Sequence, residues 1–359
     1  MDNIKLEALG DAVLQSDLDS IAADCSFAKE WKGCKVLVTG ATGLVGSQLV
    51  KALACINRVH GLGMTVLAHV RSESKAKDVF GELLERDDVV TLVGDVTSPF
   101  HIDGDVDYIF HTASVTVSKM FVNNPVETLA IAIDGTRNIL ELARDKRSKS
   151  VVYLSSMEAF GITDPNLKKI EEKDLGYIDV LSVRSSYSEG KRICECLCAA
   201  YASEYSVPVK IARLAQTFGA GVSREDGRAF AQFAKSSLRG EDIVLHTTGN
   251  SMGNYCYTAD AIRGLFTIMF KGIDGEAYTV ANESTAMKIK EVAQLVADTL
   301  SDGKTKLVFD IPESALTYGY APDVTMHLSS EKLRSLGWKP QVDLPEMFIR
   351  LANSWGKDI

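Results

Sequence analysis

A phenol and an amine lie four residues apart in the segment Tyr187-Ser-Glu-Gly-Lys191. The surrounding pattern predicts a helix, and a spacing of four residues puts both side chains on one face of it. A lysine cation beside a phenol, together with the positive charge of a nicotinamide, should lower the phenol pKa from about 10 and allow tyrosinate to act as a base. Upstream, Ser155 and Ser156 end an apolar run, and a hydroxyl there can hydrogen-bond the same substrate oxygen. These residues are therefore candidates for proton transfer to and from a substrate.

A glycine-rich segment, Val38-Thr-Gly-Ala-Thr-Gly-Leu-Val-Gly46, forms the second pattern. It follows a short apolar run and opens a helical pattern, which is the context that gives such a motif its meaning. Gly40 permits a tight turn, Gly43 lets the backbone approach a pyrophosphate, and Gly46 allows close helix–strand packing. The N–H groups at the start of the helix then face the anion. The sequence therefore predicts a dinucleotide site formed by Gly40, Thr42, Gly43, Leu44, Val45 and Gly46; the alternative is an ordinary glycine-rich turn.

The residues after the second and third strand patterns bear on the choice of cofactor. NAD sites usually place an acidic residue after the second strand to hold the ribose 2′-hydroxyl. Here Arg71 stands at that position, and a cation suits a 2′-phosphate. NADP is therefore favoured over NAD, although Arg71 can also stack on the adenine of NAD. Asp95 and Val96 follow the third strand, where an acid can accept the adenine amino group or simply shape a turn.

The spacing of strand and helix patterns predicts how these groups are positioned. Apolar, β-branched runs alternate with helical patterns, as in the βαβ units of a doubly wound parallel sheet. In such an α/β fold, ligands bind at the carboxyl ends of the strands. The expected strands span residues 35–39, 65–70, 89–93, 106–110, 150–154 and 209–213, and the expected helices lie near 46–54, 126–145, 187–205, 258–271 and 288–300.

The chain divides into three expected parts. For residues 1–33 we predict an N-terminal helical extension, with one or two short acidic helices that pack against the main fold. Residues 34–215 predict an NAD(P)-binding Rossmann domain. Residues 216–359 are expected to form mainly a smaller substrate-binding domain, and at least one of their strands or helices is expected to pack with the Rossmann domain. Within it, residues 315–330, which include Tyr318 and Tyr320, are a candidate loop over the substrate.

The composition of the chain indicates which classes of binding partner are unfavourable. The 359 residues include 39 Lys and Arg against 48 Asp and Glu, which gives a net charge of −9. This acidity argues against nucleic acid or an anionic membrane as the main partner. No segment approaches the roughly 18–20 apolar residues of a membrane span, and the acidic N-terminus lacks the basic start of a signal peptide. The seven cysteines suggest free thiols, so a cytoplasmic location is expected. We expect no metal site, because only Cys194 and Cys198 of the Cys194-Glu-Cys-Leu-Cys198 run share a helix face.

These motifs together resemble the extended short-chain dehydrogenase/reductases of the NAD-dependent epimerase/dehydratase group, from Cys34 to the C-terminus. Thr39–Gly46 matches the pattern TGxxGxxG of that group. The segment Ser155-Ser-Met-Glu-Ala-Phe-Gly161 resembles its second motif. The run Arg184-Ser-Ser-Tyr-Ser-Glu-Gly-Lys-Arg-Ile-Cys-Glu195 is most similar to the UDP-glucuronate decarboxylase branch, as are Asp226–Phe230 and Leu336–Pro340.

The resemblance implies a role for each matching position. Ser156 would orient the substrate, Tyr187 would be the base, Lys191 would modulate its pKa, and Glu158 would be an auxiliary acid or base near the sugar. Ala113 and Ser114 would line the cofactor cleft beside the nicotinamide ribose. The implied reaction oxidises C4 of a nucleotide-bound hexose, after which the 4-keto sugar epimerises, dehydrates or decarboxylates.

Departures from the family pattern fall on the substrate side. Met157 stands where 4,6-dehydratases have an acid, and Gln216 replaces a common substrate-contacting Asn. Gly253 replaces an Arg that commonly pairs with the diphosphate, which removes a charge-assisted contact. Ala132 replaces an Asn that helps to hold the lysine through water. Substrate contacts are therefore expected from Ser156, Met157, Gln216 and Arg228, although Arg228, Arg224 and Lys235 can equally be solvated surface charges.

The leading interpretation is an NAD(P)-dependent enzyme that modifies a nucleotide sugar. An NADPH-dependent ketone or aldehyde reductase is the alternative, favoured by Arg71 and by the missing diphosphate arginine. A remote alternative is an NAD(P)-sensing regulatory protein without catalysis, against which the retained Ser156, Tyr187 and Lys191 argue. The resemblance also implies a homodimer that pairs through two helices. The apolar stretches near 126–143 and 190–202 can form that surface, or they can equally be core faces.

Overall fold

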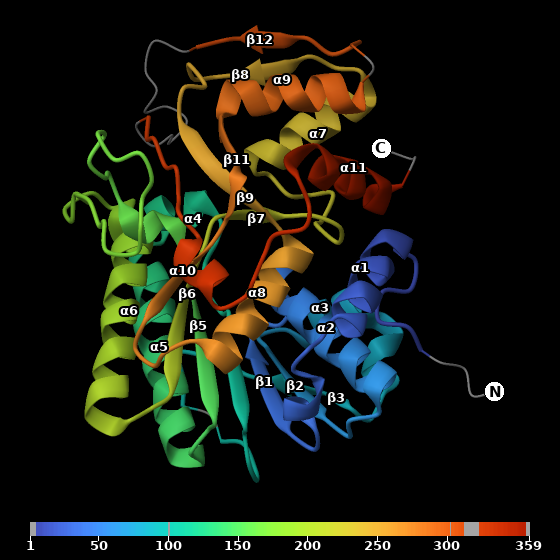
Figure 1. Ribbon diagram of the computed structural model, residues 1–359, viewed down its shortest axis with the longest axis vertical. Coiled ribbons are helices and arrows are strands. Elements are labelled where there is room, and N and C mark those ends of the chain that lie inside the picture. Colours follow the sequence, from blue (N-terminus) through green and yellow to red (C-terminus); the bar gives the residue numbers. More distant parts are fainter. Residues whose placement is uncertain (1–4, 100, 302, 312–322, 357–359) are drawn as a thin grey trace.

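The structure is a computed structural model that describes residues 5–99, 101–301, 303–311 and 323–356. Its centre is a seven-stranded sheet in the order β10-β6-β5-β4-β1-β2-β3 (Figure 1). Every neighbouring pair in this sheet is parallel. The predicted Rossmann-type, doubly wound α/β fold is therefore confirmed. The strands are β1 (Lys35–Thr39), β2 (Thr65–Val70), β3 (Val89–Val93), β4 (Tyr108–His111), β5 (Ser150–Ser156), β6 (Val209–Leu214) and β10 (Ala277–Val280).

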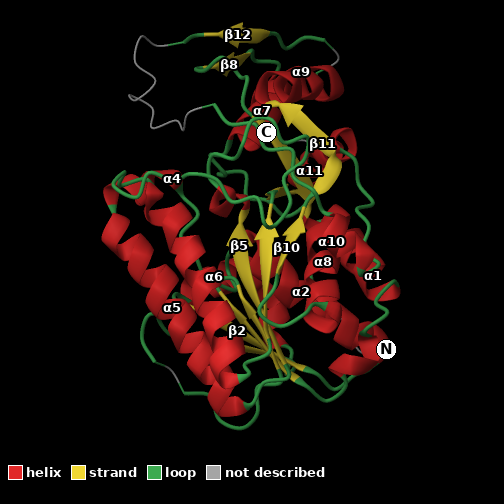
Figure 2. Ribbon diagram, turned by 60° about the vertical axis from the view of Figure 1, so that its left-hand side comes forward, coloured by secondary structure: helices red, strands yellow, loops and turns green. Residues whose placement is uncertain are grey.

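Helices cover both faces of this sheet, as Figure 2 shows. The alternation of side chains along β1 illustrates the two cores: Val36 and Val38 belong to one apolar cluster and Leu37 to another. The first cluster contains α2 (Leu44–His60) and α8 (Thr258–Lys271), and the second contains α5 (Pro125–Lys146) and α6 (Ser185–Tyr205). The shorter helices of this part are α3 (Glu73–Phe80), η2 (Gly81–Glu85), α4 (Ser118–Asn123) and η3 (Met157–Phe160).

The chain after β6 builds a smaller layer over the carboxyl ends of the strands (Figures 1 and 2). It contains a three-stranded sheet in the order β11-β9-β7 and the parallel pair β12-β8. Two elements of this region return to the large sheet: β10 pairs with β6, and α8 packs against β5 and β6. The elements are β7 (Gln216–Phe218), α7 (Ala229–Arg239), β8 (Ile243–Leu245), β9 (Met252–Tyr257), β11 (Asn282–Lys288), α9 (Ile289–Leu300), β12 (Leu307–Phe309), α10 (Glu331–Ser335) and α11 (Leu344–Trp355).

The N-terminal segment lies along the outside of the Rossmann part and contains α1 (Ala12–Ala23) and η1 (Ala28–Trp31). Trp31 is fully buried. It meets Tyr108 and Phe270 edge-on, with ring centroids 5.0 and 4.7 Å apart. Helix α1 contacts α2, α8 and α11, so the segment joins the Rossmann part of the molecule to its C-terminal layer.

The predicted elements differ from the observed ones mainly at their ends. The strands expected at 35–39, 65–70 and 89–93 and the helix expected at 258–271 have those bounds in the structure. The first helix was expected over 46–54, but α2 runs from Leu44 to His60 and ends at Gly61, which has a φ of +59°. The left-handed conformation at Gly61 ends the helix, and glycine adopts it without strain. No helix in the described part of the chain combines the length and apolarity needed to cross a membrane.

Candidate active site

The glycine turn between β1 and α2 leaves no room for side chains. Gly40 has a φ of +62°, and a Cβ on it would lie 2.7 Å from the Cα of Ala113. A Cβ on Gly46 would lie 2.4 Å from the carbonyl oxygen of Gly40. The N–H of Gly43 donates to that same carbonyl at 2.9 Å, and α2 begins at the next residue. The first N–H groups of a helix have no partner within it, so the turn presents backbone donors to a phosphate.

This turn fits the expected dinucleotide. Thr42, Leu44 and Val45 are partly exposed around the start of α2, and Gly43 is exposed. Ala113 lies directly against Gly40, and its N–H donates to the hydroxyl of Thr39 at 3.3 Å. The neighbouring Ser114 is partly exposed. The structure thus places these predicted cofactor residues around one turn at the carboxyl edge of the sheet.

Arg71 and Asp95 are neighbours at the same edge. Arg71 directly follows β2 and is exposed, and Asp95 follows β3. Hydrogen bonds from Thr97 lower the pKa of the Asp95 carboxyl, and the charge of Arg71 adds to the effect. The side chain of Val96 is buried against Gly135 of α5, and its carbonyl accepts from Asn138 at 2.9 Å. A cofactor contact by Val96 would therefore have to use its backbone N–H.

Ser156, Tyr187 and Lys191 converge beside this turn. Ser156 ends β5, whereas Tyr187 and Lys191 stand one turn apart on α6. The hydroxyls of Ser156 and Tyr187 are hydrogen-bonded. The Lys191 ammonium donates to the carbonyl of Leu154 at 2.7 Å and lies 5.7 Å from the centroid of the Tyr187 ring. The three side chains predicted to move protons are therefore adjacent.

Burial dominates the pKa values of Tyr187 and Lys191 in the protein alone. Burial raises the pKa of Tyr187 to about 12, and the carboxylate of Glu158 adds to this rise. The hydrogen bond with Ser156 and the charges of Arg184 and Arg228 oppose it. Burial lowers the pKa of Lys191 to about 8. In the protein alone, desolvation of the phenol outweighs its charged neighbours, so the predicted lowering of the phenol pKa would require the positive charge of the nicotinamide in addition to Lys191.

Glu158 is held in an ion pair at the mouth of the site. Arg184 donates to its two carboxylate oxygens at 3.0 and 3.3 Å, and the Ser188 hydroxyl donates at 3.0 Å. The ring of Phe121, from α4, stacks on Tyr187 with centroids 4.3 Å apart. The sequence interpretation gave no role to Arg184, Ser188 or Phe121. Ser188 lies inside the Tyr–Lys motif and Arg184 three residues before it, but nothing in the sequence pattern distinguishes Phe121.

The two serines that end β5 have different environments. Ser155 is buried, and its hydroxyl donates to Glu195 of α6. Arg213 of β6 pairs with the same carboxylate at 2.7 Å, and both charged groups are buried. Ser156 is partly exposed and faces Tyr187. Glu195 and Arg213 therefore tie α6 to β5 and β6, and this pairing fixes the helix that carries Tyr187 and Lys191.

The expected substrate residues lie on the side of the C-terminal layer. Met157 begins η3, Gln216 begins β7, and both are partly exposed. Arg228 immediately precedes α7, and its guanidinium pairs with Asp226 at 2.7 Å and donates to the carbonyl of Thr217 at 3.3 Å. The positive charge of Arg228 lowers the pKa of Tyr187, so the structure brings Arg228 close to the Ser–Tyr–Lys group.

The structure shows the surroundings of two departures from the family pattern. A Cβ added to Gly253 would meet nothing within 4 Å, so the missing arginine leaves open space. At Ala132, the backbone carbonyl accepts from the thiol of Cys194 at 3.1 Å. Tyr318 and Tyr320 of the candidate substrate loop lie outside the described residues. His111, expected to be structural, is buried with Thr39 and Thr136 as its partners, and burial lowers its pKa to about 3.

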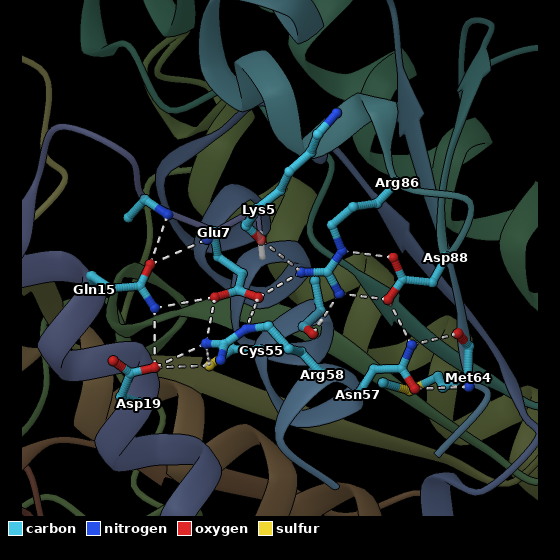
Figure 3. Close-up of polar contacts among 12 residues, drawn as sticks. Lys5, Glu7, Gln15, Asp19, Cys55, Asn57, Arg58, Met64, Arg86 and Asp88 are labelled. Atoms are coloured by element: carbon cyan, nitrogen blue, oxygen red, sulfur yellow. Dashed lines mark hydrogen bonds and ion pairs between the residues drawn. The ribbon is translucent and has the colours of Figure 1, made fainter. Parts of the chain in front are cut away.

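Cysteine and acidic groups offer one cluster of potential metal ligands within the described residues. Glu7, Asp19 and Cys55 bring one ligand atom each within 4.8 Å of one another. The guanidinium of Arg58 donates to all three, so a cation already occupies the space between them (Figure 3). The seven cysteines are all free thiols, and Cys196 is exposed whereas Cys194 and Cys198 are buried.

The fold and site together define an extended short-chain dehydrogenase/reductase: a Rossmann domain with a glycine turn between β1 and α2 and a Ser–Tyr–Lys group at the same sheet edge. Residues 36–281 match the model of the NAD-dependent epimerase/dehydratase family. The chain belongs to this family.

Relatives with established names belong to the same group. The chain is 28% identical over 313 residues to UDP-glucuronic acid decarboxylase 6 of Arabidopsis thaliana, which covers 87% of this chain and 86% of the relative. It is 29% identical over 334 residues to UDP-glucuronic acid decarboxylase 1 of Danio rerio, with 93% and 75% covered. Among solved structures, the UDP-glucose 4-epimerase of Thermotoga maritima has a TM-score of 0.75 at 20% identity, covering 90% of this chain and 99% of that one.

Proposed function

We propose that the protein is an NAD(P)-dependent enzyme that modifies a nucleotide sugar through transient oxidation at C4. The observation that carries the proposal is the convergence of Ser156, Tyr187 and Lys191 beside the glycine turn. Family membership and the names of the relatives support the substrate class. A bound nicotinamide supplies the hydride acceptor at C4 and adds a positive charge beside the phenol.

The roles of the three side chains follow from their contacts. Ser156 holds the substrate hydroxyl next to Tyr187. Tyr187 takes the proton of that hydroxyl as C4 becomes a ketone. Because burial raises the pKa of Tyr187 to about 12, the proton transfer depends on positive charge brought to the site, to which Lys191 and Arg228 contribute. The ammonium of Lys191 is held in place by the carbonyl of Leu154.

Among the reactions of this family, we propose decarboxylation of a UDP-hexuronate as the leading one. A ketone at C4 is β to the C6 carboxylate, so the electron pair left by carbon dioxide is delocalised onto the ketone oxygen, and the enol then takes up a proton at C5. The hydride removed from C4 would then return to it and reduce the ketone, which gives the pentose. Epimerisation and dehydration remain alternatives, and Met157 disfavours dehydration because it offers no acid. Glu158, paired with Arg184 and Ser188, is placed to act as an auxiliary acid or base near the sugar.

We assign the diphosphate contact to Arg228, with Met157 and Gln216 beside the sugar. The family arginine is missing at Gly253, and the space there is open. Arg228 is oriented by Asp226 and by the carbonyl of Thr217. A guanidinium held in this way is preorganised for a phosphate oxygen.

Product analysis tests the reaction. The protein is incubated with UDP-glucuronate, UDP-glucose and dTDP-glucose, and the sugars are followed by NMR. A UDP-pentose from UDP-glucuronate is expected. Tyr187→Phe should lower turnover by about 100- to 10,000-fold, the usual contribution of general acid–base catalysis. Tyr201→Phe is the matched control on the same helix, since its hydroxyl contacts only Glu141 among the described residues. Equal turnover in the two variants would contradict the role of Tyr187.

The cofactor is proposed to be NADP, with NAD as the alternative. Arg71 supports this because it is exposed directly after β2, where the adenosine ribose is expected. Arg71→Ala should weaken NADPH binding by about 10- to 100-fold, the range for hydrogen bonds to charged groups, and leave NADH binding unchanged; Lys75→Ala is the control. Equal effects of Arg71→Ala on both nucleotides would favour stacking on the adenine.

A net NADPH-dependent ketone or aldehyde reductase is the second candidate, favoured by Arg71 and by the open space at Gly253. Denaturing the purified protein and identifying any released nucleotide separates the two. A stoichiometric nucleotide supports a cofactor that is recycled within one turnover. An empty site that binds NADPH far more tightly than NADH supports the reductase.

We also propose a homodimer and a cytoplasmic location. Val126 on α5 is 79% exposed and Ile193 on α6 is 44% exposed, so both offer apolar surface to a second copy. The acidic composition and the free thiols support a reducing compartment. Light scattering on the eluted protein would measure the mass; a mass of 39.0 kDa, that of one chain, would contradict the dimer.

A further inference from the structure

The connection between β7 and α7 carries Arg228, and its first residues are held by side chains from other parts of the chain. Residues 223–225, 227 and 228 are exposed, whereas Ala220 and Val222 are buried. Four backbone groups have side-chain partners: Ala220 N–H with the Tyr257 hydroxyl at 3.4 Å, Ala220 O with Gln48 at 2.6 Å, Gly221 N–H with the Ser354 hydroxyl at 2.9 Å, and Val222 O with Trp355 at 2.7 Å.

Two of these partners are in turn held by the N-terminal helix α1. The Tyr257 hydroxyl donates to the carboxylate of Asp17, which is only 6% exposed. The Ser354 hydroxyl donates to Asp11, the residue that caps α1. Leu14 lies between Asp11 and Asp17 in the chain, and its side chain faces Gly221. A Cβ added to Gly221 would lie 2.9 Å from the Leu14 side chain. The N-terminal helix therefore contacts the base of the connection directly and through two hydroxyls.

Burial of the Asp17 carboxylate is unfavourable for the stability of the fold. A buried carboxylate loses hydration that its partners only partly replace. Asp17 accepts one hydrogen bond from Tyr257 and one from Arg350 of α11 at 2.9 Å. The positive charge of Arg263 of α8 also favours the ionised form of the Asp17 carboxyl. These partners come from β9, α11 and α8. A buried ionic group of this kind can specify one arrangement of the elements around it.

A second ionic cluster attaches the same N-terminal segment elsewhere (Figure 3). Glu7 is buried and pairs with Arg58 of α2 at 2.9 Å and with Arg86, before β3, at 2.6 Å. Arg86 also pairs with Asp88 at 2.6 Å. No contact of Glu7 reaches residues 219–228 in the described part of the chain. This cluster anchors the segment to the Rossmann part, whereas Asp17 anchors it to the C-terminal layer.

We propose that α1 is a positioning element of the substrate site, with Asp17 as its positioning residue. Asp17 fixes the Tyr257 hydroxyl, Tyr257 and Ser354 fix the backbone of residues 220–221, and Arg228 is thereby presented to an anionic substrate. Fixing the base of an exposed connection before binding lowers the entropy lost when the arginine engages its ligand. The inference rests on the assignment of Arg228 to the diphosphate under the proposed function.

The test measures binding of UDP by calorimetry in the full chain, together with KM and kcat for UDP-glucuronate. Tyr257→Phe removes only the hydroxyl that links Asp17 to Ala220. We expect UDP binding and KM to weaken about five- to tenfold, the effect of one lost hydrogen bond, with kcat and NADPH affinity unchanged. Asp17→Asn should behave in the same way. UDP affinity equal to that of the unaltered protein in Tyr257→Phe would overturn the inference.

Glu7→Gln is the matched control, because it weakens the other anchor of the same segment. It should lower the melting temperature and leave UDP affinity within twofold. An equal loss of UDP affinity in Glu7→Gln would mean that the Asp17 contacts act only through general stability, which overturns the inference.

Arg228→Gln separates this inference from the proposed function. If Arg228→Gln does not change UDP affinity, the diphosphate assignment itself fails. If it weakens UDP binding while Tyr257→Phe does not, only the positioning role fails. In the double variant, the two effects should not add, since both act through the same guanidinium; full additivity would overturn the positioning role.

Discussion

Replacing Lys191 by methionine should change how the stability of the protein depends on pH. The Lys191 side chain is buried, and burial lowers its pKa from the ordinary 10.5 to about 8. Below pH 8 the ammonium is charged in both the folded and the unfolded chain. Between pH 8 and 10.5 only the unfolded chain retains the proton, so the free energy of unfolding of the unaltered protein rises with pH across this window. Methionine removes this contribution.

The magnitude follows from the two pKa values. One pKa unit corresponds to about 1.4 kcal/mol, so burying the charged lysine costs about 3 kcal/mol below pH 8. About 2.5 kcal/mol of this is recovered between pH 7 and pH 10. Methionine also removes the hydrogen bond to Leu154, which costs about 1–3 kcal/mol. Because the neutral amine can also donate to this carbonyl, the cost applies across the whole pH range and displaces the curve more than it changes its slope.

Urea unfolding at pH 7, 8, 9 and 10 measures the effect, with no added nucleotide. The stability of the unaltered protein minus that of Lys191→Met should rise by about 2.5 kcal/mol over this range. Other groups that titrate are common to both proteins and cancel in the difference. Lys75→Met, an exposed lysine of α3, is the control and should give a flat difference. Parallel curves for the unaltered protein and Lys191→Met would refute the reasoning, because they would mean that the folded lysine keeps its ordinary pKa.

Three further outcomes are expected. Gly46→Ala should weaken NADPH binding by about 10- to 100-fold, since its Cβ would lie 2.4 Å from the Gly40 carbonyl and overpacking costs about 1–3 kcal/mol; fluorescence titration measures this, and an affinity equal to that of Ser47→Ala would contradict it. Glu195→Ala should lower the free energy of unfolding by about 3–5 kcal/mol, because it leaves the buried Arg213 unpaired; urea unfolding showing a loss below about 1 kcal/mol would count against the pair. Gly253→Arg should tighten UDP binding up to about tenfold, because the space beside Gly253 is open and a guanidinium there can pair with phosphate; calorimetry that finds no gain would show that the arginine does not reach the diphosphate.

The Rossmann part was predictable in detail because its signals are local. Each of β1, β2 and β3 is a short apolar run rich in β-branched residues, and the observed bounds equal the predicted ones. The fourth strand was expected from residue 106, but β4 begins at Tyr108. The backbone of Asp107 still bonds to Lys35 and Lys149, so this difference concerns only where regular pairing begins.

The site was predictable as a set of residues and not as an electrostatic environment. The order of the glycine turn, Ser156 and the Tyr–Lys pair in the chain was enough to place them at one sheet edge, since the carboxyl ends of parallel strands meet there. The stacking of Phe121 on Tyr187 was not predictable, because α4 is distant from α6 in the sequence. The ion pair of Glu158 with Arg184 likewise forms between two separate segments.

The sequence by itself determined the fold class, the dinucleotide turn and the identity of the Ser–Tyr–Lys group, because each depends on spacing within one strand or one helix. Only the tertiary structure decided that Ser155 is bound to Glu195 while Ser156 faces Tyr187. It also decided that burial raises the pKa of Tyr187 and that α1 reaches the base of the Arg228 connection. Desolvation and contacts between distant segments depend on which surfaces pack together, and residue order along the chain does not specify that packing locally.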